Sequence, residues 1–404
     1  MCAMSLAPYG RLLRRPAVLR LVLVALVARI PHASLGVVVT LHVVGPLGRG
    51  YGAAGIVAAA MTLGMAVGAP WRGRLVDRLG LRRALAPSVV VEAAVWIAAP
   101  FLGFEALIGA AALAGVFMVP IFSVVRQSLA VLVPREEQRT AFALDSVCTE
   151  LTFMLAPALA VLVATSWSTT AALVGVGVAT VGAGVLLMWF DPPTRSVQVL
   201  ERGGGAPPEP VSASVRASER VLSPSLLVVL LASSAASLVL NGTDVAIVAA
   251  LVEWGQASSA GWMIALWAGG SVVGGLVYGA GRRSVHPLAL VLALGLLTIP
   301  AAFAGTPMLL AVALVLAGVP CAPALSAITA TLVTIVPEHR RGEVMGWNGS
   351  AMTVGAALGA PLCGLLIDRF GASAGFLAAG AIGAAVAGTG MVVLRAARRR
   401  APRT

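Results

Sequence analysis

The chain has 404 residues, of which 59% are hydrophobic and 11% charged, and its mean hydropathy is +0.96. A soluble domain has about 45–50% apolar and about 25% charged residues, so this composition excludes a water-soluble enzyme and a disordered or fibrous protein. The net charge of +12 comes from arginine and would suit nucleic acid only if the arginines shared one surface. Four cysteines lie too far apart for a disulfide framework or a metal-ligand spacing: Cys2, Cys148, Cys321 and Cys363.

Twelve stretches are long and apolar enough to cross a bilayer, which takes about 20 mostly apolar residues per helix. They lie at 18–44, 52–71, 84–104, 106–133, 141–165, 168–190, 225–251, 258–280, 287–305, 307–335, 344–367 and 372–394. The sequence therefore predicts an all-α membrane protein with twelve transmembrane helices.

One long connection divides these stretches into two sets of six. Residues 191–224 are polar and rich in proline and glycine, which is typical of a flexible linker. We expect a six-helix bundle over 1–190, a cytoplasmic linker over 191–224, and a second bundle with a basic tail over 225–404.

The arginines predict the orientation. With the N-terminus inside, 24 of the 28 arginines fall in cytoplasmic segments, so the positive-inside rule puts both termini in the cytoplasm. Arg14-Arg15 followed by 19–28 also resembles a secretory signal, whose cleavage would leave eleven spans. The apolar pattern continues past Arg29 to Val44, which favours a retained first span.

The two halves repeat. Residues 115–134 align with 318–337 at a constant offset of 203, which places Gly115 on Gly318 and Pro120 on Pro323. Such repeats are typical of transporters that bind their substrate between two bundles near the membrane midplane.

A basic motif stands between the second and third predicted spans, and it reads Gly73-Arg-Leu-Val-Asp77-Arg78-Leu-Gly80-Leu-Arg82-Arg83. It resembles the signature of the major facilitator superfamily, Gly-x-x-x-Asp-Arg/Lys-x-Gly-x-Arg/Lys-Arg/Lys. The resemblance extends over essentially 17–397 and implies two six-helix bundles that rock around a central substrate site.

The resemblance also implies a role for the motif. The family's aspartate contacts the start of span 11, which here lies near 343–349, and Asp77 would cap the positive end of that helix. Arg78, Arg82 and Arg83 would then reach acids such as Asp145, or would serve as topology anchors.

Six ionisable residues lie inside the predicted spans, where charges are costly and usually functional: Arg29, Glu92, Arg126, Asp145, Glu150 and Asp244. Depth along the helices suggests two clusters, Arg29 with Glu150, and Arg126 with Glu92 or Asp145. Either Glu150 carries a proton or it forms a fixed ion pair. Glu92 and Asp145 are expected to be structural.

Two further residues leave alternatives open. Asp244 follows Asn241-Gly242-Thr243, where a locally unwound helix would open a binding cavity and a solvated helix end would not. His32 is either a proton relay or a hydrogen-bonded core histidine.

Together these patterns predict a secondary transporter of a bacterial inner membrane, acting as a monomer on a small amphipathic molecule and protons. A trace of the exporter signature at 355–364 favours proton-coupled efflux of a drug or metabolite. The alternative is proton-coupled import of a sugar, nucleoside or organic anion, because Arg29 and Arg126 could bind an anion. We expect no cofactor, no metal, no nucleic acid and no enzymatic activity.

Overall fold

The computed structural model describes residues 7–49, 51–195, 223–256, 259–281 and 284–400. Most of the predicted linker therefore lies outside the described residues, as do Cys2, Arg282 and Arg283. The described residues are almost all helical and contain no β-strand.

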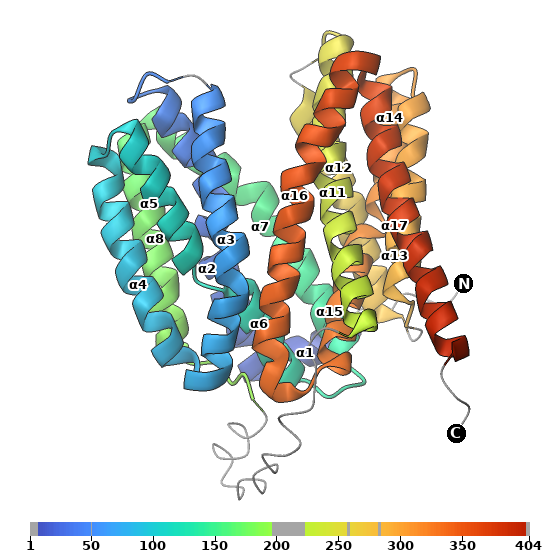
Figure 1. Ribbon diagram of the computed structural model, residues 1–404, viewed down its shortest axis with the longest axis horizontal. Coiled ribbons are helices and arrows are strands. Elements are labelled where there is room, and N and C mark those ends of the chain that lie inside the picture. Colours follow the sequence, from blue (N-terminus) through green and yellow to red (C-terminus); the bar gives the residue numbers. More distant parts are fainter. Residues whose placement is uncertain (1–6, 50, 196–222, 257–258, 282–283, 401–404) are drawn as a thin grey trace, which may run out of the picture.

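The helices form two groups that lie side by side (Figure 1). The first group contains α1 (Ala7–Leu13), α2 (Pro16–Val44), α3 (Tyr51–Leu79), α4 (Leu81–Ala98) with η1 (Ala99–Phe101), α5 (Phe104–Phe117), α6 (Ile121–Leu132), α7 (Gln138–Ser166) and α8 (Thr169–Phe190). The second group contains α11 (Pro224–Glu253), α12 (Ala260–Ala280), α13 (Pro287–Thr298) with η3 (Ile299–Phe303), α14 (Pro307–Gly318), α15 (Cys321–Ile335), η4 (Glu338–Arg340), α16 (Arg341–Phe370) and α17 (Ala372–Arg400).

Eleven helical segments of the described chain are long and apolar enough to cross a membrane. The twelfth predicted span, 287–305, forms only the shorter apolar helix Pro287–Phe303, so length and hydropathy do not confirm the count of twelve. Apolar side chains cover the outside of the molecule; Val67, for example, is 73% exposed and Ile97 72%. A large apolar surface of this kind suits contact with lipid.

Two of the spans are broken near their middle. Residues 118–120 separate α5 from α6, because Pro120 cannot donate a backbone hydrogen bond to a continuous helix. A second break, at 319–320, separates α14 from α15 just before Cys321. Only the first break leaves non-helical backbone, because Met118 and Pro120 depart from helical torsions whereas Val319 and Pro320 keep them.

The internal repeat is visible in the packing. A side chain on Gly115 would overlap the backbone of Met61 in α3, and one on Gly318 would overlap the backbone of Trp267 in α12. The two aligned glycines therefore make the same close helix–helix approach in each group.

The groups meet at one end of the molecule, which we call the linker end because Phe190 and Pro224 lie there. Figure 1 shows α3 and α16 close together at the linker end and diverging towards the opposite, far end. Hydrogen bonds join the groups in the linker half of the helices. Ser350 Oγ donates to Ala66 O (2.6 Å) and Thr140 Oγ1 to Gly279 O (2.6 Å).

The short helix α1 adds a contact that the sequence did not predict. It precedes the first span, yet Tyr9 reaches the second group, where its hydroxyl donates to Gly275 O (3.1 Å) and Leu276 O (2.9 Å) in α12. Burial raises the pKa of the Tyr9 phenol from 10.0 to about 12, so the group keeps its proton in neutral solution.

Candidate functional site

A pocket of about 240 Å³ lies between the two groups. Both groups line it: α2, α3, α5, α6, α7 and the α5–α6 break on one side, and α15 and α16 on the other. Its walls are His32, Met65, Ala69, Gly115, Met118, Val119, Pro120, Ile121, Phe122, Ser123, Arg126, Thr149, Phe153, Leu325, Met345, Asn348, Gly349, Met352 and Thr353. Methionine and phenylalanine make the pocket adaptable and apolar. Its few polar groups can fix the orientation of a ligand.

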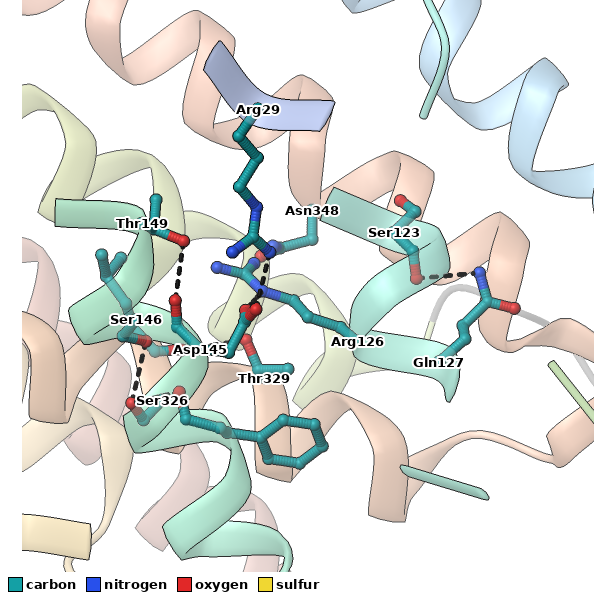
Figure 2. Close-up of polar contacts among 12 residues, drawn as sticks. Arg29, Ser123, Arg126, Gln127, Asp145, Ser146, Thr149, Ser326, Thr329 and Asn348 are labelled. Atoms are coloured by element: carbon teal, nitrogen blue, oxygen red, sulfur yellow. Dashed lines mark hydrogen bonds and ion pairs between the residues drawn. The ribbon is translucent and has the colours of Figure 1, made fainter. Parts of the chain in front are cut away.

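A charged cluster, drawn in Figure 2, lies against this pocket, because its member Arg126 is one of the pocket walls. Asp145 on α7 accepts from Arg29 Nη2 at 2.6 Å and from Arg126 Nε at 3.4 Å. All three side chains are buried, and Arg29 is fully inaccessible. Two guanidinium groups therefore share one carboxylate in the middle of the first group.

This pairing corrects two predictions. Arg29 pairs with Asp145 and not with Glu150. Asp145 is not a partner of the motif arginines, because its ion pairs go to Arg29 and Arg126. The predicted pairing of Arg126 is confirmed only for Asp145, one of the two acids considered.

Helical geometry explains the first error. Five residues separate Asp145 from Glu150, which turns the side chain by about 140° around the helix axis. Asp145 therefore faces α2 and α6, while Glu150 faces the second group. The depth estimate located both residues along the membrane normal but did not include their direction around the helix.

Glu150 makes its contacts across the interface between the groups. Its Oε1 accepts from Ser271 Oγ on α12 at 3.2 Å and lies 3.6 Å from Cys321 Sγ on α15. The described residues give this carboxylate no ion pair. The described partners of Glu150 are therefore an uncharged hydroxyl and an uncharged thiol, both on helices of the second group.

Asp244 stands on an unbroken helix. Residues 241–244 continue α11. Asn241 Nδ2 donates to Ser237 O, one helical turn earlier, at 2.8 Å. Of the two alternatives for this segment, local unwinding is contradicted, because α11 is continuous through it. Asp244 lies within electrostatic range of Glu150 and of Cys321, which places three ionisable groups in one region of the interface.

Glu92 belongs to a different cluster. It is fully buried and accepts a hydrogen bond from Trp96 Nε1 one turn later on α4. The opposite charge that acts on it electrostatically is Arg72, whose Nη2 donates to Ala84 O at 2.5 Å. The alternative partner for Arg126 was thus wrong, and Arg72 is a buried cation that the sequence reasoning missed. Its position one residue before the motif glycine was the available signal.

The motif lies on helix and not in a loop. Residues 73–79 form the last turns of α3, and the chain turns at Gly80, whose positive φ of 78° favours glycine. Asp77 accepts from the backbone nitrogens of Gly342 (3.0 Å) and Glu343 (2.8 Å), which are among the first residues of α16. The expected contact with the start of span 11 is present.

The close approach at this contact depends on small residues. A Cβ on Gly342 would overlap the Asp77 carboxylate and the backbone of Gly73. An exposed ion pair between Arg74 Nη2 and Glu343 Oε1 (2.8 Å) lies beside it. We call the contact of Asp77 with Gly342 and Glu343 the α3–α16 latch.

The remaining motif arginines are exposed. Arg82 donates from Nε to Met188 O (3.0 Å) and lies 3.5 Å from Asp191 Oδ2, so it binds the end of α8. Arg78 and Arg83 face outward at the linker end.

His32 lies in an aromatic cluster beside the pocket. Its ring packs edge-on against Phe122 (5.1 Å between centroids) and Phe153 (6.4 Å). The Arg29 guanidinium lies 4.9 Å from the Phe122 centroid, so the same aromatic ring contacts the charged cluster and the pocket.

The comparisons with known proteins decide the family. The sequence profile of the Major Facilitator Superfamily matches residues 21–280 and 235–404. The chain belongs to this superfamily. Its members are transporters, so the family supports membrane transport rather than enzymatic catalysis. No curated protein matches the sequence.

Solved structures of other transporters have the same fold as this superfamily member. The human organic anion transporter MFSD10 (TETRAN) superposes with a TM-score of 0.71 at 16% identity, over 93% of this chain and 100% of that one. A bacterial homologue of the iron transporter ferroportin, in an outward-facing state, gives 0.71 at 17% identity, over 92% and 98%. A bacterial homologue of the iron transporter ferroportin in an outward-facing state with soaked iron gives 0.72 at 16% identity, over 93% and 99%.

Proposed function

We propose that the protein is a proton-coupled exporter that works by alternating access and carries a small amphipathic molecule in the central pocket. The observation that carries this proposal is the pocket itself, whose walls come from both groups of helices. A cargo bound there touches both groups, so its exposure changes when one group rocks against the other. Import of a sugar, nucleoside or organic anion is the alternative direction and cargo.

We further propose a topology of twelve spans, with Pro287–Phe303 as the ninth and both termini in the cytoplasm of a bacterial cell. The distribution of arginine supports this orientation. The two bundles would comprise 1–190 and 225–404, joined by the cytoplasmic linker 191–224, in a monomer. The linker end is then cytoplasmic, and a molecule joined at that end and diverging at the other is outward-facing.

Glu150 is the proposed proton carrier. Asp145 has two arginines to balance its charge, whereas Glu150 has only a hydroxyl and a thiol among the described residues. An unpaired charge in lipid is costly, and binding a proton removes that cost. Glu150 lies on α7 in the first group, and its partners lie on α12 and α15 in the second. Movement of α7 away from these two helices therefore also changes the surroundings of the carboxyl. Proton binding and rocking are linked in this way.

The test replaces Glu150 with glutamine, which keeps the shape of the side chain and loses the titration. Purified Glu150→Gln in proteoliposomes should lose uphill, pH-driven transport and keep passive exchange. The transported compound is the amphipathic molecule that most raises the melting temperature in a ligand screen. Glu105→Gln makes the same chemical change at an exposed residue and should transport normally.

Two outcomes of these measurements would count against the proposal. A stable Glu150→Gln protein that still drives uphill transport removes Glu150 as the carrier, and Asp244 becomes the next acid to test. For the direction, everted vesicles acidified inside should accumulate the cargo of an exporter. Absence of accumulation there, with uptake into intact cells, supports import.

A further inference from the structure

The charged cluster beside the pocket has one positive charge too many. Arg29 and Arg126 contribute two charges and Asp145 balances one of them. None of the residues that line the pocket is acidic, so the described walls supply nothing to neutralise the second arginine. In a cavity of low dielectric constant, such an excess attracts an anion strongly.

The excess charge is available to a ligand at Arg126. Arg29 is fully buried and bonded to Asp145 at 2.6 Å, whereas Arg126 is itself a wall of the pocket. Its single described contact is the 3.4 Å interaction of Nε with Asp145. The two terminal nitrogens of Arg126 remain, and they form the fork that binds a carboxylate or a similar anion in two parallel hydrogen bonds.

A second donor faces the pocket from the other group of helices. Asn348 on α16 accepts from Ser233 Oγ through its amide oxygen at 2.7 Å. Its amide nitrogen has only a weak contact with Met352 Sδ at 3.9 Å among the described residues. Arg126 and Asn348 thus bring donors to one pocket from opposite groups, and Figure 2 shows both side chains beside Asp145.

The rest of the pocket suits an apolar body. Phe122 and Phe153 lie on the first-group side, and Met345 and Met352 on the second. Methionine side chains adapt to ligands of different outline, so the walls select for apolar bulk rather than for one shape.

We propose that the cargo is an amphipathic organic anion, whose charged head binds Arg126 and Asn348 and whose apolar body fills the pocket. The inference rests on the proposed transport function and adds the charge of the substrate. It also gives the anion a part in the cycle, because one head group bonded to both groups of helices links their movement.

The test compares ligands that differ only in charge. 4-Phenylbutyrate, 4-phenylbutanamide and 4-phenylbutylamine share one body, as do 1-naphthylacetate, its amide and the corresponding amine. Binding of each to the purified full-length protein is measured by isothermal titration calorimetry at neutral pH. We expect the carboxylates to bind at least about tenfold more tightly than their amides, as a charged hydrogen bond requires, and the amines to bind weakest.

The variants assign the preference to residues. Arg126→Gln leaves the Arg29–Asp145 pair intact, so the fold should persist while the carboxylate loses its advantage over the amide. Arg126→Lys should restore part of it. Asn348→Asp adds an acid to the pocket and should reverse the order, so that the amines bind more tightly than the carboxylates. Arg135→Gln removes an exposed charge of the same sign and should change nothing.

Carboxylates that bind no better than amides in either series would overturn the proposal, as would an unchanged ratio in Arg126→Gln. If Arg126→Gln fails to fold, Asn348→Asp still decides the question. Uphill transport of a neutral or cationic compound with no preference for anions would reject the charge assignment and leave the transporter function standing.

Discussion

At the residue scale, Asp145 is the carboxylate on which the buried charges of the first group depend. It is the described partner of both Arg29 and Arg126. Buried ion pairs add little stability compared with apolar packing, but removal of one partner leaves a charge without compensation.

Asp145→Asn should therefore destabilise the protein by about 3–5 kcal/mol, because two buried guanidinium groups lose the counter-ion that they share. The measurement is the melting temperature in one detergent at matched concentration. Adding Arg29→Gln to this variant should recover part of the loss. Arg15→Gln breaks a partly exposed pair with Glu137 (2.8 Å) and should cost at most about 1 kcal/mol. If Asp145→Asn has the same melting temperature as the wild type, the cluster does not stabilise the fold.

The sequence marked Arg29, Glu92, Arg126 and Asp145 as buried charges and missed Arg72. It predicted only some of their partners. Arg29, Asp145 and Glu150 are charges within apolar stretches, so they could be recognised without knowing which side of the helix each one occupies. Their partners depend on the rotation of each helix, and a helix that is apolar on all sides carries no amphipathic pattern to reveal it. For that reason depth alone paired Arg29 with Glu150.

At the element scale, the α3–α16 latch joins a carboxylate to the start of a helix. Asp77 accepts two backbone hydrogen bonds there, at the end of α16 that carries the positive helix dipole. Asp77→Asn keeps an acceptor oxygen and loses the charge.

We expect Asp77→Asn to insert and fold normally and to transport more slowly, since the latch favours the conformation that is closed at the linker end. The charge contributes about 0.3–1 kcal/mol if solvated and up to about 2 if partly buried. Initial transport rates at matched expression measure the effect. Arg74→Gln removes only the adjacent exposed ion pair and is the control. Wild-type rates for Asp77→Asn would remove the latch from the mechanism.

The helical elements themselves were largely predictable, because length and hydropathy define a span without knowledge of its neighbours. Eleven of the twelve predicted stretches correspond to helical segments that meet the criterion. The breaks at 118–120 and before Cys321 were not predicted, although Pro120 and Pro320 were available signals, because each apolar run is long enough to be taken as one continuous span. Helix α1 was missed because seven residues carry no clear period.

At the scale of the whole molecule, α3 and α16 run antiparallel and approach each other at the linker end (Figure 1). The spacing of the motif, Gly73-x-x-x-Asp77-Arg78-x-Gly80, recurs at the other end of α16 as Gly364-x-x-x-Asp368-Arg369-x-Gly371. Gly371 has a positive φ of 81°, close to the 78° of Gly80. Asp368 is exposed and has no described partner in this conformation.

In the proposed alternating-access cycle, closure of the far ends would bring the last turn of α16 towards the first turn of α3, where Asp368 could cap a helix as Asp77 does at the linker end. We predict that Asp368→Asn slows the cycle several-fold, for the same dipole reason and magnitude, and leaves cargo affinity unchanged. Transport rate and equilibrium binding in one preparation separate these effects. Arg369→Gln, on the next residue, is the control for surface charge. Equal rates in wild type and Asp368→Asn would exclude a second latch.

The contact of Tyr9 with α12 bears on how the protein should be handled in the laboratory. Since burial raises the pKa of its phenol to about 12, the two hydrogen bonds persist through any neutral transport assay. A bulky fusion partner attached on the N-terminal side of α1 would strain these bonds and thereby bias the two groups of helices. Helix α17 packs within its own group, so an affinity tag or fluorescent reporter attached beyond it leaves the contact between the groups undisturbed.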